Sequence, residues 1–84
     1  MYKEALIFMS LVPVGKGVQD LLERDKLIDS VVFRIGHIEY DSKLVYLVSF
    51  NKDVSSDEFN ELLTRIMKVT GCIVNYILFE KTNT

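Results

Sequence analysis

The sequence predicts a single α+β domain over residues 1–84, with a four-stranded antiparallel sheet and two helices in the order βαββαβ. Three observations predict this class. Several short segments are rich in bulky apolar residues and bounded by turn residues, as strands are. Two segments carry apolar residues at helical spacing. The chain is also short, with 49% hydrophobic and 26% charged residues, which is enough for one small core.

The chain begins with a strand and a short helix. Residues 5–12 are almost entirely apolar and show no helical polar face, which predicts a strand covered on both sides. Pro13 and then Gly15, Lys16 and Gly17 predict a loop after it. An amphipathic helix is expected from Gly17 to about Leu27. Its apolar positions are Val18, Leu21 and Leu22.

The next two strands are expected to form a hairpin. Residues 30–38 and 44–50 have strand composition, and residues 40–43 between them supply turn chemistry through Asp and Ser side chains. The apolar phase changes at Gly36, which predicts a bulge or bend there.

The second helix and the last strand complete the order. Ser55 and Glu58 match a capping box, and Gly71 is placed to end the helix. Residues 73–79 then predict the fourth strand. This order is that of the ferredoxin-like fold. From right-handed crossovers we expect both helices on one sheet face, and the first and fourth strands at the centre of the sheet.

The apolar residues of the strands predict a homodimer or a higher cyclic oligomer. Two helices leave one sheet face open, yet the third and fourth strands are apolar on both sides. Such a face forms an exposed patch that a second copy would cover. Loops that cover the patch in a monomer are the alternative. Tyr46 and Tyr76 are expected to lie in a subunit contact or in the core.

Composition argues against several classes of function. The net charge is −2 and no basic run is present, so we expect no nucleic-acid partner. The first residues lack the features of a signal peptide, and their apolar run is too short to span a membrane. One cysteine, Cys72, fits a cytoplasmic location, and it and the single histidine are too few for a metal site. We expect no enzyme activity and no cofactor.

Three small features leave alternatives open. Gly15, Lys16 and Gly17 can form an anion-binding turn before a helix, or a plain turn. His37 is an exposed hairpin histidine or a group that titrates near neutral pH. Cys72 is a small buried apolar residue or a nucleophile. The second role needs a neighbouring base, and the chain has only one histidine.

The hairpin and the end of the second helix resemble the stand-alone effector-binding domain of the Lrp/AsnC regulators. That family has Gly-Glu-Tyr-Asp after the second strand and Pro-Gly-Val before the last one. This chain has Gly-His-Ile-Glu-Tyr-Asp at residues 36–41 and Val-Thr-Gly-Cys-Ile at residues 69–73. The resemblance implies a small effector bound between subunits. The implied ligand-binding residues are Gly36, His37, Glu39, Tyr40 and Asp41.

A second resemblance is to P-II-like signalling proteins, through the turn formed by Gly15, Lys16 and Gly17. It implies a nucleotide or another anion bound between subunits. The sequence therefore predicts a cytoplasmic, non-catalytic, oligomeric domain that senses an amino-acid-like metabolite or regulates a partner. The alternatives are a P-II-like anion-binding protein and a pure assembly module with no small ligand.

Overall fold

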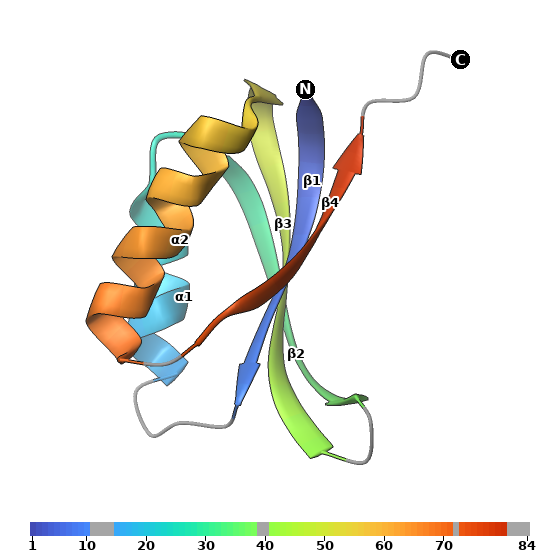
Figure 1. Ribbon diagram of the computed structural model, residues 1–84, viewed down its shortest axis with the longest axis vertical. Helices are drawn as coiled ribbons and strands as arrows, with labels where there is room; N and C mark the ends of the chain where they lie inside the picture. Colours follow the sequence, from blue (N-terminus) through green and yellow to red (C-terminus); the bar gives the residue numbers. More distant parts are fainter. Residues whose placement is uncertain (11–14, 39–40, 72, 81–84) are drawn as a thin grey trace.

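The structure, a computed structural model, describes residues 1–10, 15–38, 41–71 and 73–80. Its elements confirm the βαββαβ order. They are β1 (Tyr2–Ser10), α1 (Gly15–Arg24), β2 (Ile28–Ile38), β3 (Asp41–Val54), α2 (Ser56–Thr70) and β4 (Asn75–Glu80). Both helices lie against one face of the sheet, as Figure 1 shows, and this confirms the predicted arrangement. Among the described residues, no helix has both the length and the apolar character needed to cross a membrane.

The four strands are ordered β2-β3-β1-β4, and every neighbouring pair is antiparallel. The expectation that the first and fourth strands are central was wrong, because β1 and β3 are central and β4 lies at the edge. The physical reason is that β2 and β3 must be neighbours as a hairpin. Since α1 carries the chain past one strand position, β3 fills the gap between β2 and β1. The crossover through α2 then passes β1 and places β4 on its far side.

Several local expectations also differ from the structure. Helix α1 ends at Arg24 rather than near Leu27, and residues 41–43, expected in the turn of the hairpin, already belong to β3. The first three residues of α1 are Gly15, Lys16 and Gly17, so this segment is the first helical turn rather than a loop. The apolar spacing marks only the part of the helix that begins at Val18, and it missed the three residues before it. No bulge occurs at Gly36, which pairs with Lys43 in an uninterrupted ladder. A Cβ at Gly36 would lie 3.2 Å from Cγ2 of Val45, so the glycine leaves room for that side chain.

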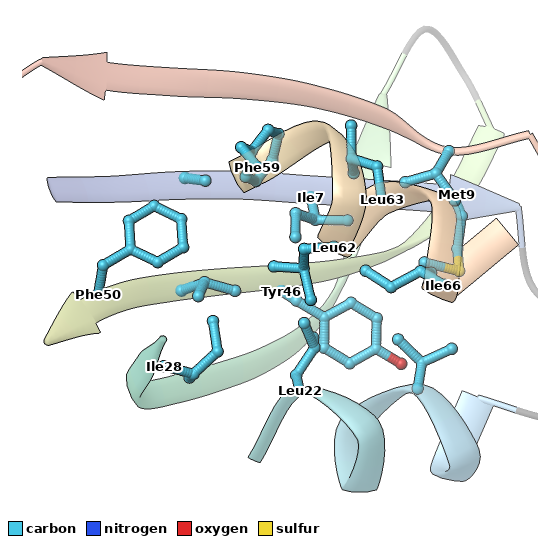
Figure 2. Close-up of a cluster of buried hydrophobic side chains, with 14 of the residues drawn as sticks. Ile7, Met9, Leu22, Ile28, Tyr46, Phe50, Phe59, Leu62, Leu63 and Ile66 are labelled. Carbon is cyan, nitrogen blue, oxygen red and sulfur yellow. The ribbon is translucent and has the colours of Figure 1, made fainter. Parts of the chain in front are cut away.

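One hydrophobic core fills the space between the sheet and the helices (Figure 2). It takes alternate residues of the central strands and the apolar stripes of both helices. The fully buried side chains are Ala5, Ile7, Val18, Leu22, Tyr46, Val48, Val54, Phe59, Leu62 and Ile66. Aromatic contacts connect the layers. The ring of Phe59 lies 6.1 Å from that of Phe50 and 5.1 Å from that of Tyr76.

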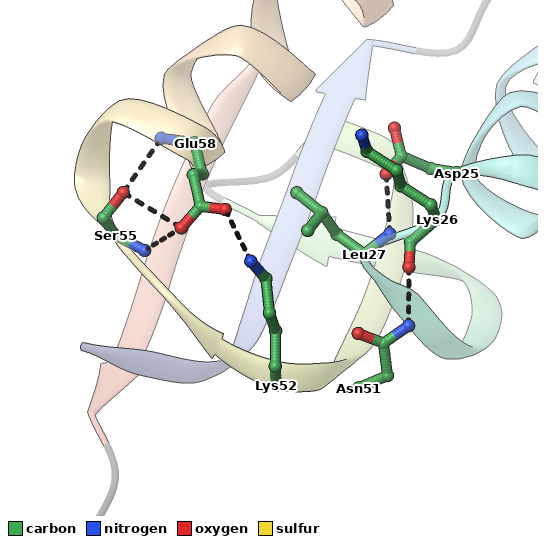
Figure 3. A network of polar contacts seen from close by, with 7 residues as sticks. All are labelled: Asp25, Lys26, Leu27, Asn51, Lys52, Ser55 and Glu58. Carbon is green, nitrogen blue, oxygen red and sulfur yellow. Dashed lines mark hydrogen bonds and ion pairs between the residues drawn. The ribbon is translucent and has the colours of Figure 1, made fainter.

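The ends of α2 follow the sequence prediction. Ser55 Oγ accepts a hydrogen bond from the Glu58 backbone N–H at 3.2 Å, and the Glu58 carboxylate accepts one from the Ser55 N–H at 3.1 Å (Figure 3). Together these bonds form the expected capping box. At the other end Gly71 has a left-handed φ of 68°, and its N–H donates to the Met67 carbonyl at 2.8 Å.

This capping box predicts that stability depends on pH. The hydrogen bond from the Ser55 backbone and the neighbouring Lys52, whose Nζ lies 3.1 Å from Glu58 Oε2, lower the pKa of Glu58 below 4.5. A carboxyl whose pKa is lower in the folded state stabilises the fold above its unfolded pKa, and this contribution is lost as the pH falls through the folded pKa. We expect Glu58→Gln to lower the unfolding midpoint at pH 7, and expect the difference from wild type to shrink at pH 3. Urea titrations at several pH values measure this.

The matched control for that measurement is Glu61→Gln, which removes an exposed carboxylate from the same helix. An equal loss for Glu58→Gln at every pH would contradict the role of the ionised carboxylate. The same loss in Glu61→Gln would assign the effect to the overall charge of the helix.

Candidate functional site

The sheet face opposite the helices carries an apolar row that crosses all four strands. Val32 of β2 pairs with Leu47 of β3, which lies beside Leu6 of β1, which in turn lies beside Ile77 of β4. Because side chains alternate along a strand, these residues point away from the core. Val32 is 42%, Leu47 37% and Ile77 50% exposed, so no described part of the chain covers the ends of this row.

The adjacent rows extend the apolar surface. In the row two residues further along β1, Phe8 of β1 lies beside Val45 of β3. In the row two residues earlier along β1, Phe79 of β4 lies at the end. We call the combined surface the open-face patch. It consists of Leu6, Phe8, Val32, Val45, Leu47, Ile77 and Phe79. Polar side chains border it, with Arg34 and Asn75 at the two ends of the Phe8 row and Glu4 beside Phe79.

The open-face patch is a contiguous apolar surface. At about 4.8 Å between strands and about 7 Å between same-face residues of one strand, its seven residues cover roughly 240 Å². The other five positions of the three rows are polar: Glu4, Ser30, Arg34, Ser49 and Asn75. A contiguous exposed apolar surface of a few hundred Å² is a candidate interaction site. The sequence predicted an apolar open face, and the strand register supplies its arrangement.

Among the described residues, two shallow grooves of about 440 and 510 Å³ lie beside the end of α1. Arg24, Asp25 and Arg65 line both. One Asp25 carboxylate oxygen accepts a hydrogen bond from the Leu27 N–H at 3.0 Å, and the other pairs with Arg65. Asn51 of β3 holds the same loop by donating to the Lys26 carbonyl at 2.6 Å (Figure 3). These bonds give Asp25 and Arg65 a structural role between α1 and α2.

The predicted ligand site at the hairpin is only partly covered by the structure. Gly36 lies in β2 near the end of the ladder, and the backbones of His37 and Asp41 continue the pairing of β2 with β3. Glu39 and Tyr40 lie outside the described residues, as do the side chains of His37 and Asp41. The ligand-binding role of this hairpin stays a prediction.

The alternative anion site is also only partly covered by the described residues, and Cys72 is not covered at all. Gly17 borders the smaller groove, and the Lys16 side chain and Cys72 lie outside the described residues. Within the part of the chain that the structure describes, no three His, Cys, Asp or Glu side chains are grouped to hold a metal ion. Tyr46, expected in a subunit contact or in the core, lies in the core.

Comparison of the chain with protein-family models, with curated proteins and with solved structures finds no match.

Proposed function

We propose that the protein is a non-catalytic regulatory domain that works as a homo-oligomer, in which the open-face patch packs against the same patch of a second copy. The observation that carries this proposal is the apolar row from Val32 through Leu47 and Leu6 to Ile77. Burying it removes from water the apolar surface that the two helices leave uncovered.

The open-face patch can pack against the same patch of a second copy. A two-fold axis parallel to the strands, placed between β1 and β3, brings β3 of one copy over β1 of the other. Leu47 then faces Leu6 of the second copy, and Val45 faces Phe8, so apolar residues meet at the centre of these two rows. In the third row Phe79 faces Ser30, and Glu4 faces Ser49. The axis places Val32 opposite Ile77 in the same way, and no two like charges oppose each other within these rows.

The available area agrees with such a contact. With strands of about nine residues, the whole open face measures roughly 600 Å² per copy, and the pair buries about 1,200 Å². This value lies at the lower end of the range for stable, specific interfaces. A homodimer formed through this face is therefore large enough to persist without another partner.

The regulatory part of the proposal rests on the sequence. The resemblance of residues 36–41 to the Lrp/AsnC effector-binding domain supports an amino-acid-like metabolite bound at a junction between subunits. The single cysteine supports a cytoplasmic location. Assembly without any small ligand is the alternative, and both forms need the same sheet-to-sheet contact.

The test is the mass of the native protein and of Leu47→Lys, measured by native mass spectrometry and light scattering at micromolar concentration. We expect an oligomer for the wild type. Because Leu47→Lys places an unpaired charge in the contact of each copy, a loss of several kcal/mol should weaken association by at least about a hundredfold. Val69→Lys is the control, since Val69 is 52% exposed on α2 and lies outside the patch.

A wild-type protein that is monomeric at this concentration would overturn the proposal. So would a Leu47→Lys variant that keeps the wild-type mass. The native spectra also report any small molecule retained by the oligomer, which separates the sensing form of the proposal from assembly alone.

A further inference from the structure

Glu4 places a charge within the open face of the sheet. It lies on the central strand β1, between Ser49 of β3 and Phe79 of β4, in the row next to that of Leu6. Its side chain is exposed, and the alternation of β1 points it to the same side as Leu6 and Phe8. A contact formed by the open-face patch therefore includes this carboxylate, because the central strands lie in the middle of the contact.

The charge of Glu4 is not balanced by the described residues around it, and it forms no ion pair with any of them. Its two neighbours in the ladder are uncharged. Lys3 on β1 and Asp53 on β3 lie in the stretch where the pairing of these two strands shifts register, and their opposite charges offset each other. Arg34 lies on β2, in the row of Phe8, two rows away from Glu4.

We infer that Glu4 makes self-association through the open-face patch depend on pH. This inference rests on the proposed function, because it uses the two-fold axis between β1 and β3. That axis places Glu4 opposite Ser49 of the second copy and brings the two Glu4 residues diagonally across the axis from each other. With sheets about 10 Å apart and strands about 4.8 Å apart, their Cα atoms are roughly 11 Å apart, and both side chains extend into the space between the sheets. Asp29 of the second copy, next to the Ser30 that faces Phe79, is also acidic.

Association therefore brings two carboxylates near each other and shields both from water. Each of these effects disfavours the ionised form of a carboxylate. The associated form then binds protons more readily than the separate chains, so association tightens as the pH falls. At about 11 Å and an effective dielectric constant of about 20, the repulsion between two unit charges alone corresponds to roughly a tenfold change in the dissociation constant. Salt screens this repulsion.

Sedimentation equilibrium of the wild type and of Glu4→Gln, at pH values from 7 to 5 and at low salt, tests this inference. Glu4→Gln keeps the size and polarity of the side chain and removes its charge. At pH 7 we expect its dissociation constant to be at least about tenfold lower than that of the wild type, and we expect the difference to shrink as the pH falls. Glu61→Gln is the matched control, since it makes the same change in net charge on α2, and its dissociation constant should stay within about twofold of the wild-type value.

The outcomes separate this inference from the proposed function. Equal dissociation constants for Glu4→Gln and the wild type at every pH overturn the role of Glu4, and the proposed function stands if Leu47→Lys still weakens association. Equal tightening in Glu61→Gln also overturns that role, because it assigns the effect to the overall charge. A monomer for both the wild type and Glu4→Gln at micromolar concentration overturns the proposed function itself. Circular dichroism checks that Glu4→Gln is folded, as the exposed position of Glu4 leads us to expect.

Discussion

Tyr46→Asp is expected to leave the chain largely unfolded. Tyr46 is fully buried on β3, and its ring lies 5.1 Å from that of Phe33. Burial raises the pKa of the tyrosine hydroxyl, which shows that this position disfavours a negative charge. An aspartate here loses the ring contacts and must bury a charge or stay protonated, at a cost of several kcal/mol. At roughly 0.05–0.15 kcal/mol per residue, a domain of this size has a total stability of only about 4–13 kcal/mol.

Circular dichroism and urea titration measure this effect, with Tyr46→Phe as the control. Tyr46→Phe keeps the ring and removes only the hydroxyl, so its expected loss is about 1 kcal/mol. A Tyr46→Asp variant that keeps the wild-type unfolding midpoint and loses only its oligomeric state would contradict the core position. It would place Tyr46 in a subunit contact, the alternative that the sequence left open.

Phe59→Ala is expected to lower the free energy of unfolding by about 3–5 kcal/mol. Phe59 is fully buried on α2 and meets the rings of Phe50 and Tyr76 in edge-to-face geometry. Its removal leaves a cavity between α2 and the sheet, and it removes the edge-to-face contact with the Tyr76 ring.

Urea unfolding of Phe59→Ala, Phe59→Leu and Met67→Ala tests this expectation. Phe59→Leu refills part of the cavity and should lose clearly less than Phe59→Ala. Met67 is 38% exposed on the same helix, and its truncation should cost well under half as much as that of Phe59. Equal losses for Phe59→Ala and Met67→Ala would show that α2 packs on the sheet through a different face.

The second helix shows what local sequence is able to predict. Its cap depends on Ser55 and Glu58, which are three positions apart, and its end depends on Gly71 and the Met67 carbonyl. These contacts lie within one helical turn, so the residues that form them are close together in the sequence and can be recognised from it. The start of α1 escaped prediction because Gly15, Lys16 and Gly17 carry neither a capping pattern nor an apolar side chain.

Gly36 shows the opposite case. The change of apolar phase at this residue predicted a bulge, but the backbone pairs regularly with Lys43. The reason for the glycine lies in β3, where the Val45 side chain occupies the space that a Cβ at position 36 would approach. A contact between neighbouring strands cannot be read from the order of residues along one of them.

By itself, the sequence determined the order of the six elements, the ends of α2 and the excess of apolar residues on the strands, because periodicity and capping act over a few residues. Only the tertiary structure decided that β1 and β3 are central and that β4 is an open edge. It also decided that Val32, Leu47, Leu6 and Ile77 form one row. The physical reason is that strand order and register depend on pairing between segments far apart in the chain, and each strand pattern is compatible with several neighbours.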